Sequence, residues 1–178
     1  SDTGWTEVSA GGTHSLALRS DGSLWGWGDN SSRQLGLAGG GTLPAPTQIG
    51  TAKDWVAIAA GQMFSVAIKD TGVLWFFGGN AAPKPAGAYA DWKTLSAGYS
   101  IALTRKDGSA WTTVLPQEFD GRTLTDFTES MLVRVDNRND WASVSAGKWY
   151  HFIGVRTDGT LWGWGDNSFG DSGQPVLT

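Results

Sequence analysis

The chain has 178 residues and a formal net charge of −4, from 13 basic and 17 acidic side chains. This balance argues against a nucleic acid partner and against general binding to anionic lipid, because both need a basic face. No apolar run approaches membrane-spanning length, so no membrane insertion is expected. The chain has no cysteine, which excludes disulfides, thiolate nucleophiles and Cys-ligated zinc but leaves the compartment open.

The composition favours a folded chain of short strands. Hydrophobic residues make up 40% of the sequence, and 11 tryptophans supply material for a packed core. The 26 glycines are about twice the usual share, and with only 6 prolines and no collagen-like triplet they indicate many tight turns. Helix signals are weak, apart from a possible helix within residues 119–131. We therefore expect an all-β protein.

Four units follow one another along the chain. They open at Trp5, Trp55, Trp92 and Trp141, and the glycine of an Ala-Gly pair follows six residues later at Gly11, Gly61, Gly98 and Gly147. The units run approximately over residues 5–54, 55–91, 92–140 and 141–178, and we expect one repeat domain over 1–178. Such units bury their apolar faces by stacking on their neighbours.

Each unit contains a predicted central hairpin. An alternating apolar run comes first, over Ser15–Leu18, Ser65–Ile68, Ser100–Leu103 and Phe152–Val155. A turn follows at Asp21-Gly22, Thr71-Gly72, Asp107-Gly108 and Asp158-Gly159, and another tryptophan lies three residues beyond each turn glycine. Two alternating runs joined through such a turn indicate an antiparallel hairpin, because glycine accepts the positive φ. With a strand at the start of each unit, such as 55–61, and a short last strand, such as 46–50, each unit has about four strands.

The units differ in their outer parts. The heptamer LWGWGDN occurs at 24–30 and again at 161–167, but the third unit lacks it. In its place is an atypical segment, 112–139, which we interpret as an added function or a remodelled edge. The second unit has a trimmed connection after Asn80.

Residues 10–30 and 146–167 closely resemble the repeat of the regulator of chromosome condensation family. The resemblance extends over nearly the whole chain and implies a β-propeller-type array of four antiparallel repeats. Well-known members of that family usually have seven blades. The resemblance therefore leaves two arrangements open, a closed four-blade ring or a partial propeller completed by oligomerisation as a homo-oligomer, since bare sheet edges are a liability.

One tryptophan has no place in the repeat. Ten of the eleven occupy repeat positions and are expected to pack between blades, whereas Trp149 lies in the connection after Gly147. Equivalent connections meet on one face of a propeller, and Trp and Tyr are enriched at binding hot spots. The predicted partner-binding residues are Lys148, Trp149, Tyr150, Gln62, Met63, Phe64 and Tyr99. The resembled family includes a propeller-type β-lactamase inhibitor that uses aromatic residues of this loop to grip its partner.

The other chemical candidates are interpreted as structural. His14 and His151 hold matching places and are expected to form structural hydrogen bonds; Ser15, Ser65 and Ser100 also recur with the period. Asp29 and Asp166 are predicted turn formers, and 136–140 a surface turn. No catalytic residue, metal or cofactor is predicted.

The sequence therefore predicts a non-enzymatic protein-binding or scaffold module that uses loops on one propeller face, with a protein partner. An alternative is an oligomeric surface or virion structural component, and a secreted or virion-surface location is favoured over a cytoplasmic or nuclear one. Nucleotide exchange on a small GTPase, which the resemblance also brings, is less favoured, as is a hydrolase built from carboxylates of different blades.

Overall fold

The computed structural model describes residues 3–79, 82–113, 127–170 and 173, and its strands form four antiparallel sheets. Sheet 1 contains β1 (Trp5–Ala10), β2 (His14–Arg19), β3 (Leu24–Asp29) and β4 (Thr42–Gln48). Sheet 2 contains β5 (Trp55–Ala60), β6 (Ser65–Lys69), β7 (Leu74–Phe77) and β8 (Lys84–Pro85). Sheet 3 contains β9 (Trp92–Ala97), β10 (Ile101–Arg105), β11 (Ala110–Thr113) and β12 (Leu132–Arg134). Sheet 4 contains β13 (Trp141–Ala146), β14 (His151–Arg156) and β15 (Leu161–Gly165).

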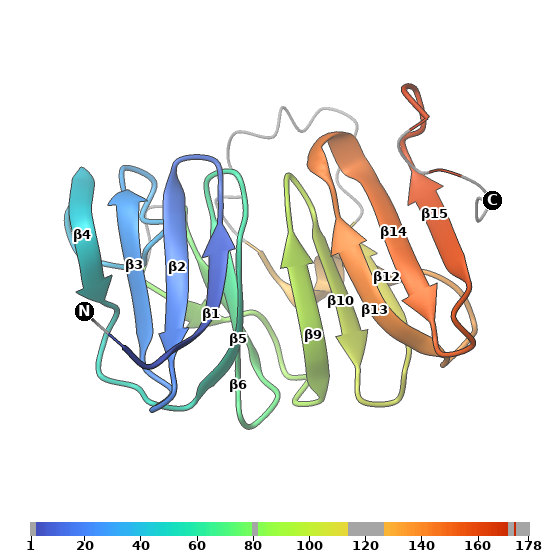
Figure 1. The fold of residues 1–178 in the computed structure, drawn as a ribbon, viewed down its shortest axis with the longest axis horizontal. Coiled ribbons are helices and arrows are strands. Elements are labelled where there is room, and N and C mark those ends of the chain that lie inside the picture. The colour runs from blue at the N-terminus through green and yellow to red at the C-terminus, as the bar shows by residue number, and fades with distance from the viewer. Residues whose placement is uncertain (1–2, 80–81, 114–126, 171–172, 174–178) are drawn as a thin grey trace.

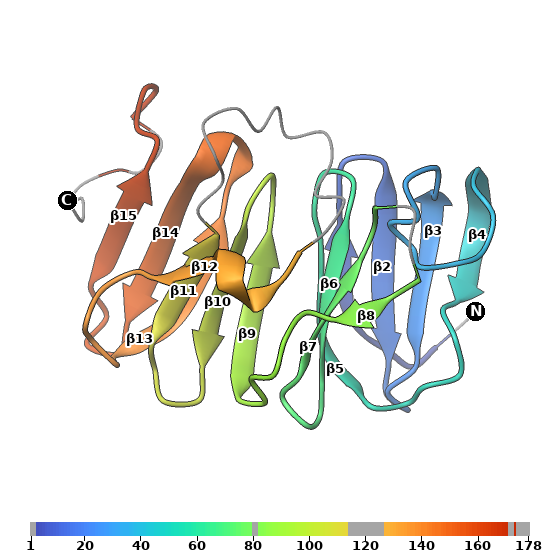
Figure 2. The same cartoon turned by 180° about the vertical axis from the view of Figure 1, so that it is seen from behind.

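Each sheet is a meander, in which consecutive strands are also neighbours. The first strand of each sheet begins at the tryptophan that opens the corresponding unit, and the Asp-Gly or Thr-Gly turns join the second and third strands. The sheets stand side by side in chain order, with the first strands towards the viewer in Figure 1 and the last strands β8 and β12 nearest in Figure 2. The all-β fold of repeated blade-like sheets is thus confirmed.

Strand pairing corrects the register expected for the third unit. Ser15 pairs with Ala10, and Ser65 pairs with Ala60, but the residue that pairs with Ala97 is Ile101. Ser100 therefore takes the place of His14 in the repeat and does not recur with Ser15 and Ser65. The connection before β10 is one residue shorter than in sheets 1 and 2, so spacing counted from the opening tryptophan displaced the run by one residue.

The row of sheets is open, with β4 at one end and β15 at the other (Figure 1). This corrects the expectation of a closed four-blade ring. Closing four sheets needs a quarter turn between neighbours, which would separate the outer strands. Instead, Ile49, Ala86 and Leu132, in or just after the outer strands, are buried in the clusters between sheets. Completion by other copies stays a prediction.

Three hydrophobic clusters hold the row together, each from two neighbouring sheets. Trp55, Trp92 and Trp141 lie buried in these clusters, on the side of their sheet that faces the preceding sheet. Trp5, their counterpart in sheet 1, is only half-buried because no described sheet precedes it. The period of the sequence is therefore the period of the core.

The described part of segment 112–139 completes sheet 3. Phe127 is fully buried between sheets 2 and 3, stacked at an angle on Phe76 with ring centroids 5.9 Å apart. A 3-10 turn, η1 (Glu129–Met131), leads into β12, which pairs with β11. Residues 119–126 of the possible helix and Asn80 of the trimmed connection lie outside the described residues. Among the described residues, no helix has the length and apolar character needed to cross a bilayer.

Candidate functional site

The connections between the first two strands of all four sheets lie at the same end of the row, at the top of Figure 1. They border one hollow of about 320 Å³. Gly12, Gln62, Tyr99 and Lys148, one residue from each connection, all line it. The structure thus brings residues far apart in the sequence to one shallow, four-sided site.

Backbone hydrogen bonds join neighbouring loops and fix their relative positions. Gly12 N–H donates to the Gly61 carbonyl at 3.1 Å, and Gln62 N–H donates to the Gly98 carbonyl at 3.0 Å. A Cβ placed on Gly98 would lie 2.4 Å from the Gly147 carbonyl oxygen. The glycine of the Ala-Gly pair therefore allows the backbones of neighbouring loops to come this close. The loops are therefore presented by a rigid support.

Two tyrosines and a lysine meet across sheets 3 and 4. The rings of Tyr99 and Tyr150 have centroids 6.2 Å apart at an interplanar angle of 36°, and Lys148 Nζ lies 5.9 Å from the Tyr99 ring centroid. Tyr150 has a φ of 63°, the left-handed region that a bulky side chain rarely adopts. Its carbonyl accepts the N–H of Asp166 at 3.1 Å, which helps to hold this backbone in place. Strained residues of this kind cluster at ligand contacts.

The predicted site residues divide into three groups. Gln62, Met63, Tyr99 and Tyr150 are half-buried, and Lys148 is exposed, so all five lie at the surface of the loop end. The side chain of Trp149 lies outside the described part of the structure, although its backbone belongs to the 3-10 turn η2 (Lys148–Tyr150).

Phe64 is the exception, and the structure corrects its assignment to the contact surface. Its side chain is 3% exposed and stacks on Phe76 with ring centroids 5.9 Å apart. Phe64 takes the repeat position of His14 and Ser100, which are also buried. The presence of His14 immediately before an apolar run was the signal that this position faces inward.

His14 joins sheet 1 to sheet 2. Its Nε2 lies 2.8 Å from Ser65 Oγ, and the Ser65 hydroxyl donates to the Gln34 carbonyl at 2.7 Å. Because that hydroxyl proton is already used, His14 Nε2–H must donate to Ser65. Burial lowers the pKa of His14 to about 4, against a smaller opposing effect of the Asp29 charge. The structural interpretation of this histidine is therefore supported.

Sequence reasoning missed one recurring cation. Arg19, Lys69, Arg105 and Arg156 each lie three residues before the turn glycine and stack on the two tryptophans of their own sheet. In sheet 1 the Arg19 guanidinium carbon is 4.6 Å from the Trp5 ring centroid and 4.4 Å from that of Trp25. The fixed spacing of a basic residue before each turn was the available signal. The second tryptophan of each sheet thus makes a cation–π contact within its own sheet. Trp75, Trp111 and Trp162 also pack against the clusters between sheets.

The turn carboxylates are structural too. In sheets 1, 3 and 4 the turn aspartate accepts a hydroxyl that in turn accepts a tryptophan Nε1–H, as in Asp107, Ser109 and Trp111 at 2.6 Å and 2.9 Å. Hydrogen bonds from Ser109 lower the pKa of Asp107. Asp29 and Asp166 cap their turns through the N–H groups of Ser31 and Ser168, each at 2.9 Å.

Comparison with known proteins decides the family. The model of the regulator of chromosome condensation (RCC1) repeat matches residues 5–34 and 141–171, and a second model of the same repeat matches residues 21–68. Together these matches cover more than half of the 178 residues. The chain belongs to the RCC1 repeat family.

Relatives with RCC1-type folds are longer than this chain. The ultraviolet-B receptor UVR8 of Arabidopsis thaliana is 25% identical over 167 residues, which are 93% of this chain and 30% of UVR8. Human WBSCR16 superposes with a TM-score of 0.74 at 18% identity, over 92% of this chain and 48% of that one. Prp20p of Saccharomyces cerevisiae, described with its binding to Gsp1p and histones, gives 0.71 at 20%, over 94% and 46%. The chain thus spans about half the length of these solved structures.

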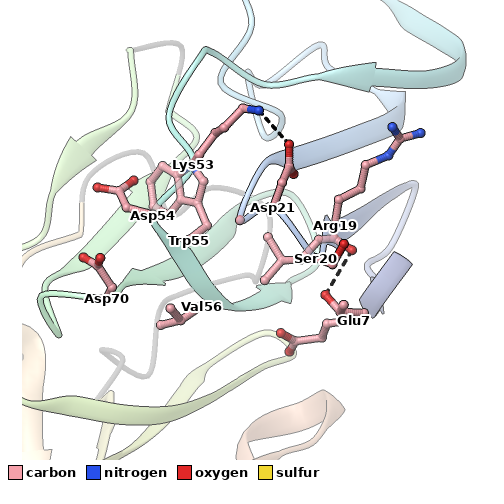
Figure 3. A pocket seen from close by; sticks show the side chains of 12 residues that line it. Glu7, Arg19, Ser20, Asp21, Lys53, Asp54, Trp55, Val56 and Asp70 are labelled. Atoms are coloured by element: carbon pink, nitrogen blue, oxygen red, sulfur yellow. Dashed lines mark hydrogen bonds and ion pairs between the residues drawn. The ribbon is translucent and has the colours of Figure 1, made fainter. Parts of the chain in front are cut away.

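A second hollow of about 550 Å³ lies between the first two RCC1 repeats, near their Asp-Gly and Thr-Gly turns (Figure 3). Four carboxylates border it: Glu7, Asp21, Asp54 and Asp70. Two of them are already paired, because Asp21 lies 2.8 Å from Lys53 Nζ and Asp54 lies 3.0 Å from Lys69 Nζ. Hydrogen bonds from Lys53 and Ser23 lower the pKa of Asp21, whereas burial raises that of Glu7.

Two of the four carboxylates at this RCC1-repeat hollow, Asp21 and Asp54, are held by lysines and do not form a free pair. A catalytic carboxylate pair needs one acid with a raised pKa facing a second available carboxylate. Figure 3 shows Asp54 and Asp70 on one side of Trp55 and Asp21 with Lys53 on the other. Within the described residues, no group of three or more His, Cys, Asp or Glu side chains has the arrangement of a metal site.

Proposed function

We propose that this chain is a non-enzymatic protein-binding module that presents the four loops between the first two strands of each repeat to a protein partner. The single observation that carries the proposal is the hollow of about 320 Å³ at which all four loops meet. Tyr99 and Lys148 line it, and Tyr150 packs against Tyr99. Tyrosine is enriched at protein interfaces and at their hot spots. The strained Tyr150 backbone further supports a contact role at this rim.

The family supports a binding function in general terms. Prp20p is described as binding Gsp1p and histones, and another structure contains it bound to Kap60. Those partners belong to Prp20p, and this chain shares only 20% identity with it, so the likeness supports the fold and a protein partner in general. Nucleotide exchange on a GTPase stays the less favoured candidate, because the sequence predicts no residue of this chain that would carry it out.

The test is site-specific photo-crosslinking with an extract of the source organism. A photoreactive phenylalanine analogue replaces Gln62 at the loop end, and in a control protein it replaces Val56, which is 53% exposed at the other end of the same repeat. We expect one protein to be crosslinked from position 62 and not from position 56.

A competition experiment tests whether the loops form the crosslinked contact. Excess unlabelled wild-type chain should abolish the crosslink, whereas a Tyr99→Ala/Tyr150→Asn variant should compete at least about tenfold less well, the effect of losing one hot-spot contact. Asparagine at position 150 keeps a residue that tolerates positive φ. Equal competition by a variant with an unchanged near-ultraviolet circular dichroism spectrum would contradict the proposal.

A second candidate function is an oligomeric structural component on a secreted or virion surface. The open row of sheets, with uncovered faces at both ends, favours the oligomeric part of this candidate.

A further inference from the structure

The three contacts between neighbouring sheets repeat one pattern of hydrogen bonds. The N–H of the opening tryptophan donates to the turn glycine of the preceding sheet: Trp55 to Gly22 at 3.3 Å, Trp92 to Gly72 at 3.1 Å and Trp141 to Gly108 at 3.0 Å. Serine makes a further bond in two contacts, where Ser9 Oγ accepts Ala60 N–H at 2.9 Å and Ser96 Oγ accepts Ala146 N–H at 3.1 Å. Each sheet thus has a leading face for the next sheet and a trailing face for the preceding one.

The leading face of sheet 4 is apolar and uncovered. Strand pairing puts Ile153 at the position of Leu16 and Val66, and Leu161 at the position of Leu24 and Leu74. Those four residues are at most 1% exposed, whereas Ile153 is 38% exposed and Leu161 is 53% exposed. The difference arises because the leading faces of sheets 1 and 2 are covered by the next sheet.

The trailing face of sheet 1 shows the matching feature. Val8 takes the position of Ile58 and Val144, which pair with the equivalent residues of their second strands. Val8 is 73% exposed, compared with 3% for Ile58 and 7% for Val144. Isolated exposed valines are common, but this one stands where two later repeats have a buried residue and the third has Leu95, which packs against the cluster between sheets 2 and 3.

The polar partners of the contact are also in place. Ser145 occupies the position of Ser9 and Ser96, the two serines that accept an N–H from the next sheet. The space around the turn glycines agrees: a Cβ on Gly22 would lie 2.2 Å from the Lys53 carbonyl oxygen, while a Cβ on Gly159 would have nothing within 4 Å. The space beside the turn glycine that the next sheet fills at Gly22 is therefore open at Gly159.

We propose that the leading face of sheet 4 binds the trailing face of sheet 1 in a second copy of this chain, and that two copies close into one ring. The partner is identified by continuity, because sheet 1 is built to the same pattern as the sheets that fill the three internal contacts. The chain covers 48% of the length of WBSCR16 and 46% of that of Prp20p, so two copies together are about as long as one such propeller chain. Two such rows meet at both ends, which gives a closed dimer and no filament.

This dimer has eight sheets, twice the four of one chain. It would also gather the loops of both copies at one end of the ring. The inference does not rest on the proposed function, because the uncovered faces are separate from the loop rim.

Sedimentation equilibrium at micromolar concentration tests the proposal. We expect the wild-type chain to have twice its 18.9 kDa mass. Val8→Glu and Leu161→Glu should each raise the dissociation constant by a factor of roughly ten or more, because each buries an unpaired charge in both contacts. Val56→Glu, a charge at a similarly exposed valine away from both faces, should leave the dimer intact.

Mixing the two disrupted variants distinguishes this geometry from other dimers. A Val8→Glu chain keeps its leading face and a Leu161→Glu chain keeps its trailing face, so one intact contact forms between them. We expect the mixture to associate more tightly than either variant alone. A wild-type monomer, or a mixture that is no tighter, overturns the proposal.

An engineered disulfide gives a second reading, since the chain has no cysteine of its own. Ala10→Cys/Ser145→Cys should form a covalent dimer on oxidation, at the positions that bond as Ala60 to Ser9 and Ala146 to Ser96 inside the chain. Either single variant should form none. Ser9→Cys/Ala60→Cys is the matched control, which should form its bond within one chain.

Discussion

Replacing Trp92 with alanine is expected to lower the free energy of unfolding by about 4 kcal/mol, in the range for deleting a buried aromatic side chain. Trp92 is 1% exposed and belongs to the cluster between sheets 2 and 3. Its ring makes an edge-to-face contact with Trp111 at 6.2 Å and lies 5.7 Å from the Arg105 guanidinium carbon. Its Nε1–H donates to Glu129 at 2.8 Å. The substitution therefore creates a cavity between sheets 2 and 3 and removes the hydrogen-bond donor of Glu129.

Trp5→Ala is the matched control, measured by urea unfolding in dilute solution where the chain is monomeric. Trp5 makes the same edge-to-face contact, with Trp25 at 5.7 Å, and the same cation contact, with Arg19 at 4.6 Å. Among the described residues it has neither the preceding sheet nor a counterpart of the hydrogen bond from Trp92 to Glu129, so its loss should cost clearly less than that of Trp92. Equal losses would show that stability comes from packing within each sheet, contrary to the role assigned to the contacts between sheets.

The second large effect is a loss of stability in mild acid through His14. Its folded pKa is about 4, below its ordinary value of 6.5, because burial disfavours the imidazolium. Nδ1 is buried without a hydrogen-bond partner, so a proton added there would be unsatisfied. The unfolded chain binds the proton more readily between these two values. Stability is therefore complete above pH 6.5 and falls as the pH drops towards 4, by about 3 kcal/mol in total.

Unfolding by urea across pH 4 to 7 measures this effect, with His14→Gln as the variant. Glutamine can still donate to Ser65 but does not titrate, so the difference between the two curves isolates His14. Glu7 acts with the opposite sign, because burial raises its pKa and the folded chain then holds its proton more tightly. Parallel curves for wild type and His14→Gln would contradict the assigned role.

The sequence predicted the repeated fold well because the packing that defines it is local. Trp55, Trp92 and Trp141 open their strands, and an Asp-Gly or Thr-Gly turn joins the next two, so each hairpin is specified within about twenty residues. Where local spacing slipped, the prediction failed: the shortened connection before Ile101 moved the register by one residue and gave Ser100 the wrong place. Only the pairing with Ala97 restores it.

The loop site could be predicted in part from the sequence, again because the repeat is local. Equivalent loops of a repeat meet at one end, which brought Gln62, Tyr99 and Lys148 to one hollow. Phe64 could not be assigned in this way, because its direction depends on Phe76 and the next sheet. The contact between Tyr99 and Tyr150 likewise joins residues from two sheets.

By itself the sequence determined the four units, their hairpins and the tryptophan positions, since each follows from residues close together in the chain. The tertiary structure alone decided that the row stays open. That outcome depends on how whole faces pack: buried outer-strand residues such as Ile49 and Leu132 keep neighbouring sheets face to face. It also decided which repeat positions lack a partner, because Val8 and Leu161 look like core residues in the sequence and differ only in having no sheet beside them.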